Sequence, residues 1–187
     1  TFEGDDNEAL SMIRVKNNSA FRKAASNGHL GVCRFLKECG LTIADVRAKD
    51  NWALKRACSN GRMEVACFLL DWGRTCNSGR QCCLGLKDLR AGNNRAFRKA
   101  AHCGKEKLCD LLMSWRDPYG NGLTLEDVRS VDNYALRKAA QDNRCSVLKL
   151  LKNLGLTIQD VRSCDNFALR HAVKHGNLNI CHFLKNW

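Results

Sequence analysis

The stretch Asn51-Trp-Ala-Leu-Lys55 decides the fold, because the chain contains its pattern five times. The pattern is Asn, any residue, Ala, Leu or Phe, and then a basic residue. Its other occurrences are Asn18-Ser-Ala-Phe-Arg22, Asn94-Arg-Ala-Phe-Arg98, Asn133-Tyr-Ala-Leu-Arg137 and Asn166-Phe-Ala-Leu-Arg170. Self-similarity at a period of about 20 to 50 residues is the signature of a repeat architecture.

The copies begin 33, 43, 39 and 33 residues apart. The two longer units contain extra residues in one place, about ten at 74–83 and six at 116–121, and without them every period is 33. The predicted units are 18–50, 51–93 with the first insertion, 94–132 with the second, 133–165 and a shorter unit at 166–187. Residues 1–17 are expected to be part of a preceding unit or a cap.

Each unit is predicted to form two short antiparallel helices. In the first, Ala20-Phe21 and Ala24-Ala25 fall on one face. Gly28 then ends the helix, because glycine accepts the left-handed conformation of a C-terminal cap. The second helix places Val32, Cys33 and Leu36 on its apolar side. One such pair cannot bury its apolar faces alone, so neighbouring pairs are expected to stack.

The 33-residue period, the Ala-Leu-basic-x-Ala-Ala helix and the Asn27-Gly-His-Leu30 turn together resemble the ankyrin repeat. The resemblance covers residues 10–187 and implies an all-α, ankyrin-like solenoid of about five helix pairs. Basic residues replace the family's His, and the turn between units is extended. Thr42-x-x-Asp45, Thr124-x-x-Asp127 and Thr157-x-x-Asp160 resemble capping boxes and predict an extra helical turn there. The variant looks like the divergent ankyrin repeats of giant viruses and some protists.

The composition is that of a globular chain with an excess of positive charge. Of its 187 residues 44% are apolar and 27% charged, and the formal net charge is +12. Residues 9–187 contain 31 basic residues against 15 acidic ones. Such a positive electrostatic field favours acidic partners, whether protein, phosphoinositide or nucleic acid. The longest apolar run, Val65 to Leu70, is too short for a membrane span, and no signal sequence is evident.

The twelve cysteines are interpreted as reduced thiols of an intracellular protein, cytoplasmic or nuclear, and in a host cell if the source is viral. Cys33, Cys58, Cys109 and Cys181 occupy repeat positions of the predicted core, as do Trp72, Trp115 and Trp187. No cysteine spacing matches a zinc site. The insertion cysteines are left open between free thiols and a metal or disulfide site; they are Cys76, Cys82 and Cys83.

Two consecutive basic residues in each first helix predict a positive stripe. The pairs are Arg22-Lys23, Lys55-Arg56, Arg98-Lys99, Arg137-Lys138 and Arg170-His171. The first member of each pair stands where the resemblance implies a structural His, so it could instead donate to backbone carbonyls. The second members have no such role. The predicted binding residues are Lys23, Arg56, Lys99, Lys138, His171, Arg22, Arg98 and Arg137.

A second basic row is expected to be structural. It comprises Arg14, Arg47, Arg90, Arg129 and Arg162, and three of its members precede an Asp by three residues. The predicted local pairs are Arg47 with Asp50, Arg129 with Asp132 and Arg162 with Asp165.

No nucleophile–base set, phosphate-binding loop or metal-ligand set is found, which favours a non-enzyme without cofactor. His171 and His175 lack a third ligand, and the loop after Pro118 is interpreted as an ordinary turn. We expect a monomeric protein-interaction module with an acidic partner. The alternative is nucleic-acid binding through the stripe, with phosphate contacts and little sequence readout.

Overall fold

The computed structural model describes residues 10–73 and 82–187, and within these ranges the chain is all-helical without strands. The helix pairs are α2 with α3, α5 with α6, α8 with α9, α10 with α11 and α12 with α13. Their bounds are Val15–Asn27, Leu30–Glu38, Ala48–Ser59, Met63–Leu70, Ala91–His102, Glu106–Ser114, Leu125–Gln141, Cys145–Asn153, Ile158–Lys174 and Leu178–Lys185. Two helices of one turn, α4 (Ile43–Val46) and α7 (Leu86–Leu89), precede α5 and α8.

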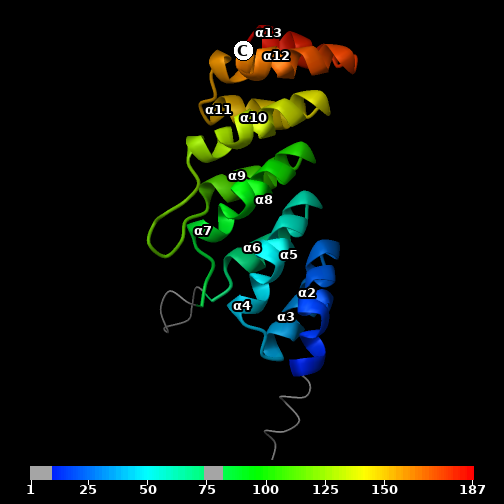
Figure 1. Ribbon diagram of the computed structural model, residues 1–187, viewed down its shortest axis with the longest axis vertical. Helices are drawn as coiled ribbons and strands as arrows, with labels where there is room; N and C mark the ends of the chain where they lie inside the picture. Colours follow the sequence, from blue (N-terminus) through cyan, green and yellow to red (C-terminus); the bar gives the residue numbers. More distant parts are fainter. Residues whose placement is uncertain (1–9, 74–81) are drawn as a thin grey trace, which may run out of the picture.

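The pairs follow one another along the long axis of the molecule (Figure 1). The first helices form one layer, in which α2 packs on α5, α5 on α8, α8 on α10 and α10 on α12. The second helices form another, in which α3 contacts α6, α6 contacts α9 and α9 contacts α11. The loop between α9 and α10 projects from the side on which α4 and α7 lie.

Small and branched side chains fill the space between the two layers. The largest fully buried side chains include Phe21, Leu54, Phe97 and Leu136, which occupy the same position in successive first helices. Alanines one turn later are also fully buried, so neighbouring helices approach closely. Trp72 and Trp115 are buried as predicted, and the half-buried Trp187 packs against the same core and donates from its indole nitrogen to the Leu156 carbonyl at 3.0 Å.

The predicted core cysteines Cys33, Cys58 and Cys109 are fully buried, which confirms their assignment, and Cys181 is half-buried. Burial raises the pKa of the Cys33 thiol to about 11 and that of Cys58 to about 12. Because the thiolate is the reactive form, these cysteines are poor nucleophiles and metal ligands. Cys76 lies outside the described residues.

The predicted extra turns are present. Thr42 donates its backbone N–H to the Asp45 carboxylate at 2.8 Å, and the boxes at Thr124 and Thr157 repeat this contact. A fourth box, not predicted from the sequence, begins at Gly85, whose N–H donates to Asp88 at 2.9 Å. This box was missed in the sequence because glycine stands where the other boxes have threonine. The capping contact nevertheless forms, since it needs only the backbone N–H.

A left-handed turn joins each extra turn to the first helix that follows. Three consecutive residues there have positive φ, as at Lys49, Asp50 and Asn51 with φ of 54°, 57° and 56°. The same geometry recurs at 16–18, 92–94, 131–133 and 164–166. A left-handed conformation costs an L-residue about 1–2 kcal/mol, least for Asn, Asp and Gly. The turn therefore needs other contacts to stabilise it.

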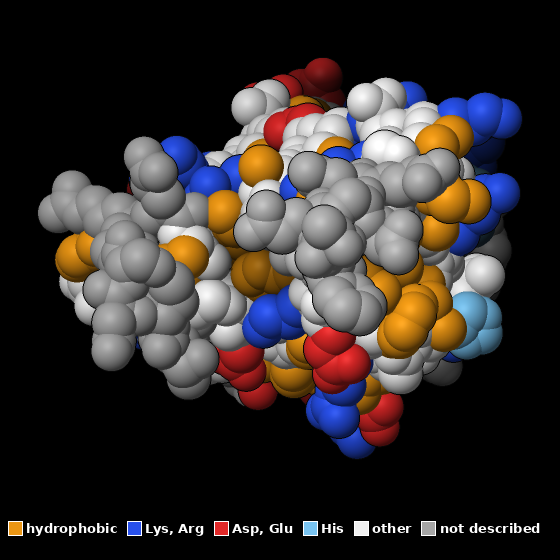
Figure 2. Space-filling view, turned by 90° about the horizontal axis from the view of Figure 1, so that it is seen from below, with side chains coloured by type: hydrophobic (Ala, Val, Ile, Leu, Met, Phe, Trp, Pro, Cys, Tyr) orange, Lys and Arg blue, Asp and Glu red, His pale blue; other side chains and the backbone are white. Residues whose placement is uncertain are grey.

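The end of the molecule formed by α2 and α3 exposes apolar surface. Figure 2 looks onto this end and shows apolar side chains at the surface among basic ones. Val32 and Phe35 of α3 are among the exposed apolar residues, with Phe35 61% accessible. None of the helices in the described ranges combines the length and apolarity needed to cross a membrane.

Candidate functional site

The first member of each basic pair stabilises the left-handed turn. Arg22 donates to the carbonyls of Asn17 and Lys16 at 2.9 and 3.1 Å. Arg98, Arg137 and Arg170 make the same two bonds to the turns that precede them. The structural role considered for these positions is therefore realised, with the carbonyls supplied by the left-handed turn just before the arginine's helix.

The same guanidinium groups also cover aromatic rings of the next unit. The guanidinium carbon of Arg22 lies 5.0 Å from the Trp52 ring centre, that of Arg98 4.8 Å from Tyr134, and that of Arg137 4.8 Å from Phe167. These are cation–π distances. Arg22, Arg98 and Arg137 were predicted to bind a partner, but their donors and faces are already engaged within the chain.

The second members differ among themselves. Lys23 and Arg56 are exposed, and Lys99 is half-buried. The ammonium of Lys138 donates to the Gln141 side chain at 2.8 Å. His171 stacks on Phe167 at 3.8 Å between ring centres, and burial together with nearby cations such as Lys174 lowers its pKa. His171 is therefore neutral near pH 7 and adds no positive charge to the stripe at that pH.

Several cations gather in a hollow between α5 and α8, which we call the basic hollow. It is open, has a volume of about 540 Å³, and lies over the first-helix layer. Five cations line it against one carboxylate, Asp50; they are Lys49, Lys55, Arg56, Arg95 and Lys99. Lys55 contacts Asp50 directly. The other four cations have no carboxylate within ion-pair distance among the described residues.

The basic hollow exists because one residue departs from the repeat. Trp52, Tyr134 and Phe167 place a ring at the second position of the motif, and each ring lies under the arginine of the preceding unit. In α8 this position is Arg95, and the preceding unit has Lys55 in place of arginine. Without a ring between them, the two helices leave open space lined by charge.

Sequence reasoning missed Arg95 and Lys49, and the repeat alignment contained the signal for Arg95. At the second motif position the five units have Ser19, Trp52, Arg95, Tyr134 and Phe167, so one cation stands among aromatic and small residues. Lys49 was given no role from the sequence. Only the left-handed turn brings its side chain to the same hollow as Arg95.

A histidine lies at the edge of the basic hollow. His102 also lines it, and its Nε2 lies 2.8 Å from the Asp142 carboxylate. Burial lowers the pKa of His102, with Asp142 opposing and Lys99 and Lys138 adding to the shift. The imidazole is therefore neutral near pH 7 and adds no charge to the hollow at that pH.

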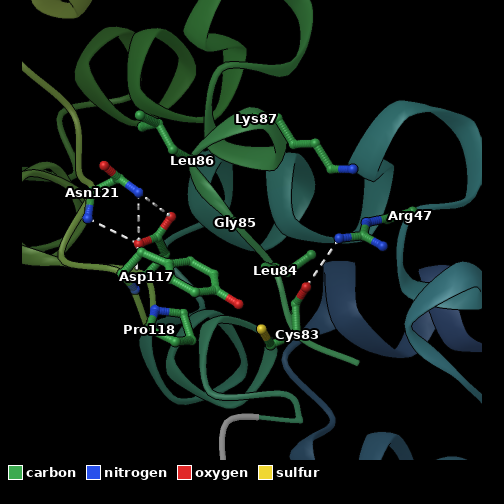
Figure 3. A pocket seen from close by; sticks show the side chains of 10 residues that line it. Arg47, Cys83, Leu84, Gly85, Leu86, Lys87, Asp117, Pro118 and Asn121 are labelled. Carbon is green, nitrogen blue, oxygen red and sulfur yellow. Dashed lines mark hydrogen bonds between the residues drawn. The ribbon is translucent and has the colours of Figure 1, made fainter. Parts of the chain in front are cut away.

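A second cavity, of about 420 Å³, lies where the α9–α10 loop meets α7 (Figure 3). Its buried carboxylate, Asp117, accepts bonds from the backbone N–H groups of Tyr119 and Asn121, both at 2.9 Å. Burial raises the pKa of Asp117, but these bonds and the Asn121 side chain outweigh it and leave the pKa below its usual value. This geometry stabilises the loop after Pro118.

The second arginine row was assigned to the wrong partners. The predicted local pairs do not form; Asp50 contacts Lys55 instead. Arg14, Arg47, Arg90 and Arg129 each pair with the capping-box aspartate of the next unit, at Asp45, Asp88, Asp127 and Asp160, with shortest distances of 2.8–2.9 Å. The role is structural as expected, but it joins units rather than shaping one turn. We call these four pairs the Arg–Asp ladder.

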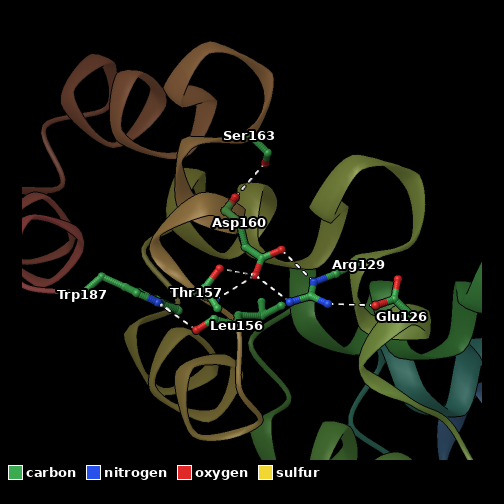
Figure 4. A network of polar contacts seen from close by, with 7 residues as sticks. All are labelled: Glu126, Arg129, Leu156, Thr157, Asp160, Ser163 and Trp187. Atoms are coloured by element: carbon green, nitrogen blue, oxygen red, sulfur yellow. Dashed lines mark hydrogen bonds and ion pairs between the residues drawn. The ribbon is translucent and has the colours of Figure 1, made fainter.

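Figure 4 shows the last step of the Arg–Asp ladder. Arg129 donates from Nε and Nη2 to the two oxygens of Asp160, at 2.9 and 3.2 Å, and Thr157 donates to the same carboxylate. Burial raises the pKa of Asp160, but these hydrogen bonds outweigh it and hold the pKa below its usual value. Asp45, Asp88 and Asp127 have lowered pKa values for the same reasons.

In the part of the chain that the structure describes, no three His, Cys, Asp or Glu side chains gather as metal ligands would. His171 and His175 are stacked with 6.0 Å between ring centres. The comparisons with known proteins add no family: no family model matches the sequence, and no curated protein matches it significantly.

Proposed function

We propose that the protein is a non-catalytic interaction module that binds an acidic protein partner through the basic hollow and the neighbouring exposed cations. The fold we propose is an ankyrin-like solenoid of five helix pairs, supported by the stacked pairs and the 33-residue period. The observation that supports the function most is the convergence of Lys49, Arg56, Arg95 and Lys99 on one open hollow.

The physical argument concerns unbalanced charge. Several arginines elsewhere in the structure, such as Arg47 and Arg98, bond to aspartates or backbone carbonyls, and these bonds offset the cost of holding the side chains in place. In the basic hollow, cations from two helices face one another with a single carboxylate among them. Like charges at short range repel, so an acidic group entering the hollow gains attraction from several cations at once.

The structure favours an acidic protein over a nucleic acid on one point. Proteins that bind single strands stack bases on exposed aromatic rings. Here Tyr134 and Phe167 lie under the arginines of the preceding units, whereas Trp52 lies between Arg22 and Arg56 and also lines the basic hollow. Nucleic-acid binding by phosphate contacts alone is the second candidate, supported by the regular placement of Lys23, Arg56 and Lys99 along the first-helix layer.

Measured binding of matched probes tests this proposal. Labelled Glu-rich peptides, and single- and double-stranded DNA and RNA of similar charge, are titrated with the protein and followed by anisotropy at increasing salt. We expect peptide binding to persist at physiological salt. Nucleic-acid binding should fall steeply and linearly in log salt.

The decisive variant is Arg56→Glu with Arg95→Glu and Lys99→Glu. Its matched control places the same charge change on second helices, at Lys107, Lys149 and Lys185. We expect the hollow variant to lose at least about tenfold in affinity for the peptides and the control to lose much less. Equal losses in both would show that net charge alone attracts the probes and would overturn the assignment of the hollow.

Two properties are part of the same proposal. We propose that the protein acts inside a cell, where its many thiols stay reduced, and that it is a monomer. Light scattering after size exclusion, with and without reductant, checks both: a mass near 21 kDa in each condition is expected. A dimer in either condition would contradict the monomer.

A further inference from the structure

The Arg–Asp ladder repeats one arrangement of donors and acceptor. At one end of the molecule the same donors are present without an accepting carboxylate among the described residues. At each of the four junctions an arginine pairs with the capping-box aspartate that follows, and at three of them the asparagine four residues after the arginine donates to the same carboxylate. Arg47 and Asn51, for example, both donate to Asp88, at 2.9 and 3.2 Å. Asn18 and Asn94 make the matching bonds to Asp45 and Asp127. The carboxylate is thus held by donors of two kinds.

In the last unit the equivalent donors are Arg162 and Asn166 of α12. Both are exposed, and neither contacts a carboxylate among the described residues. The four equivalent asparagines are buried, at 5–9% exposure; they are Asn18, Asn51, Asn94 and Asn133. The left-handed turn that presents them is nevertheless formed at 164–166, as in the other units. The donors are therefore already positioned.

Apolar positions beside these donors are uncovered in the same way. Leu169 is 37% exposed, whereas its equivalents Phe21, Leu54, Phe97 and Leu136 are 0–1% exposed. Val173 is 62% exposed, whereas Ala25, Cys58, Ala101 and Ala140 are fully buried. The polar and apolar parts of this face thus match, position by position, the surface that four internal junctions cover.

We propose that Arg162, Asn166, Leu169 and Val173 form a docking surface, the end socket, for a polypeptide that presents a Thr-x-x-Asp or Gly-x-x-Asp capping box at the start of a helix. The aspartate would accept a bidentate pair from Arg162 and a bond from Asn166, as in the Arg–Asp ladder. Apolar side chains of the following helix would cover Leu169 and Val173. The occupant is inferred by continuity with the four junctions on which the same surface is already covered.

A second copy of this chain is a poorer occupant. The residue that would have to supply the carboxylate lies two positions before the arginine of a unit, as Asp45 lies before Arg47. In the first unit, Met12 holds this position before Arg14 and is exposed. A thioether cannot accept the charged hydrogen bonds of Arg162. Head-to-tail stacking of copies would therefore leave Arg162 unpaired, and the occupant is a different segment with its own capping box.

A peptide with the sequence of residues 154–187 tests the end socket in trans, since it contains the box at Thr157 and Asp160. It is labelled and titrated with the full chain by anisotropy. We expect saturable binding that weakens at least about tenfold when the peptide has Asp160→Asn or the protein has Arg162→Met. The matched control, Lys107→Glu, and the hollow variant should bind the peptide normally, which separates this surface from the basic hollow.

A second measurement keeps the proposal testable if the isolated peptide stays unfolded. The full chain is extended after Trp187 by another copy of residues 155–187, and its thermal midpoint is compared with that of the parent chain. We expect a higher midpoint, most of which is lost when Arg162→Met is introduced or the added box has Asp→Asn. A midpoint at or below that of the parent, together with absent peptide binding, would overturn the proposal.

Discussion

The Arg–Asp ladder and the basic hollow contain the same kind of basic side chain in opposite electrostatic surroundings. In the ladder, each arginine meets a carboxylate within 2.9 Å, and that carboxylate also caps a helical turn. In the hollow, Arg56 and Arg95 face other cations around open space. The difference teaches that a basic residue is held in an ion pair where the next unit supplies a carboxylate, and is left without one among the described residues where the next unit supplies another cation.

Acid should break the Arg–Asp ladder first, and this is the largest effect we expect. The folded-state pKa values of Asp45, Asp88, Asp127 and Asp160 lie below the ordinary value. Such groups contribute stability above the unfolded pKa of about 3.9, and the contribution is lost as pH falls through the folded values. The free energy of unfolding, measured with urea, should therefore be nearly independent of these four groups from pH 7 to 5. It should fall steeply below about pH 4.

The four-fold Asp→Asn variant is the control for this prediction. It should be less stable than the parent at pH 7 and show a shallower loss of stability in acid, because the linked protons are gone. A parent whose free energy of unfolding stays unchanged down to about pH 2.5 would contradict the role of these carboxylates.

Removing one acceptor should be the next largest effect. Asp88→Ala deletes the bonds from Gly85, Arg47 and Asn51 and leaves the guanidinium, already two-thirds covered, without its partner. We expect a loss of about 3 kcal/mol in the free energy of unfolding, since breaking a buried pair from one side is costly. Arg95→Ala in the basic hollow, the matched comparison, should change it by less than about 0.5 kcal/mol. Equal losses in the free energy of unfolding for Asp88→Ala and Arg95→Ala would contradict the distinction between the Arg–Asp ladder and the basic hollow.

The two members of one basic pair should also differ. Arg137→Met removes two bonds to the carbonyls of Asp132 and Val131 and the contact with Phe167, which should cost about 1–2 kcal/mol. Lys138→Met removes only the bond to Gln141 and should cost less than about 0.5 kcal/mol. Chemical denaturation of both variants measures the difference. A larger loss at Lys138 than at Arg137 would reverse our assignment of the stabilising member.

A small gain in stability should come from converting the basic hollow into an ordinary junction. Lys55→Arg with Arg95→Phe restores the arginine-over-ring arrangement seen at Arg98 and Tyr134. We expect a gain of about 0.5–1 kcal/mol, the size of an exposed cation–π contact. Binding of the Glu-rich peptides should weaken at the same time. A variant that binds them as tightly as the parent would show that the hollow is not needed.

How far the sequence could lead is seen in particular residues. The Thr-x-x-Asp boxes were predicted, because a cap depends only on residues three apart in the chain. The partners of Arg47 and Arg129 were not, since short spacing suggested Asp50 and Asp132 while the true acceptors lie 41 and 31 residues away. His171 was counted as a cation from its place in the repeat, but its charge depends on Phe167 and on burial.

The sequence by itself determined the helix pairs and the positions that point into the core, because periodicity, glycine caps and capping boxes act within a few residues. Only the tertiary structure decided which basic residues are engaged and which face open space. The left-handed turns bring Lys49 beside Arg95, and stacking brings each arginine to the aspartate of the next unit. Charge is long-ranged and its neighbours come from different units, so its role is set by how the units pack and not by the order of residues within one.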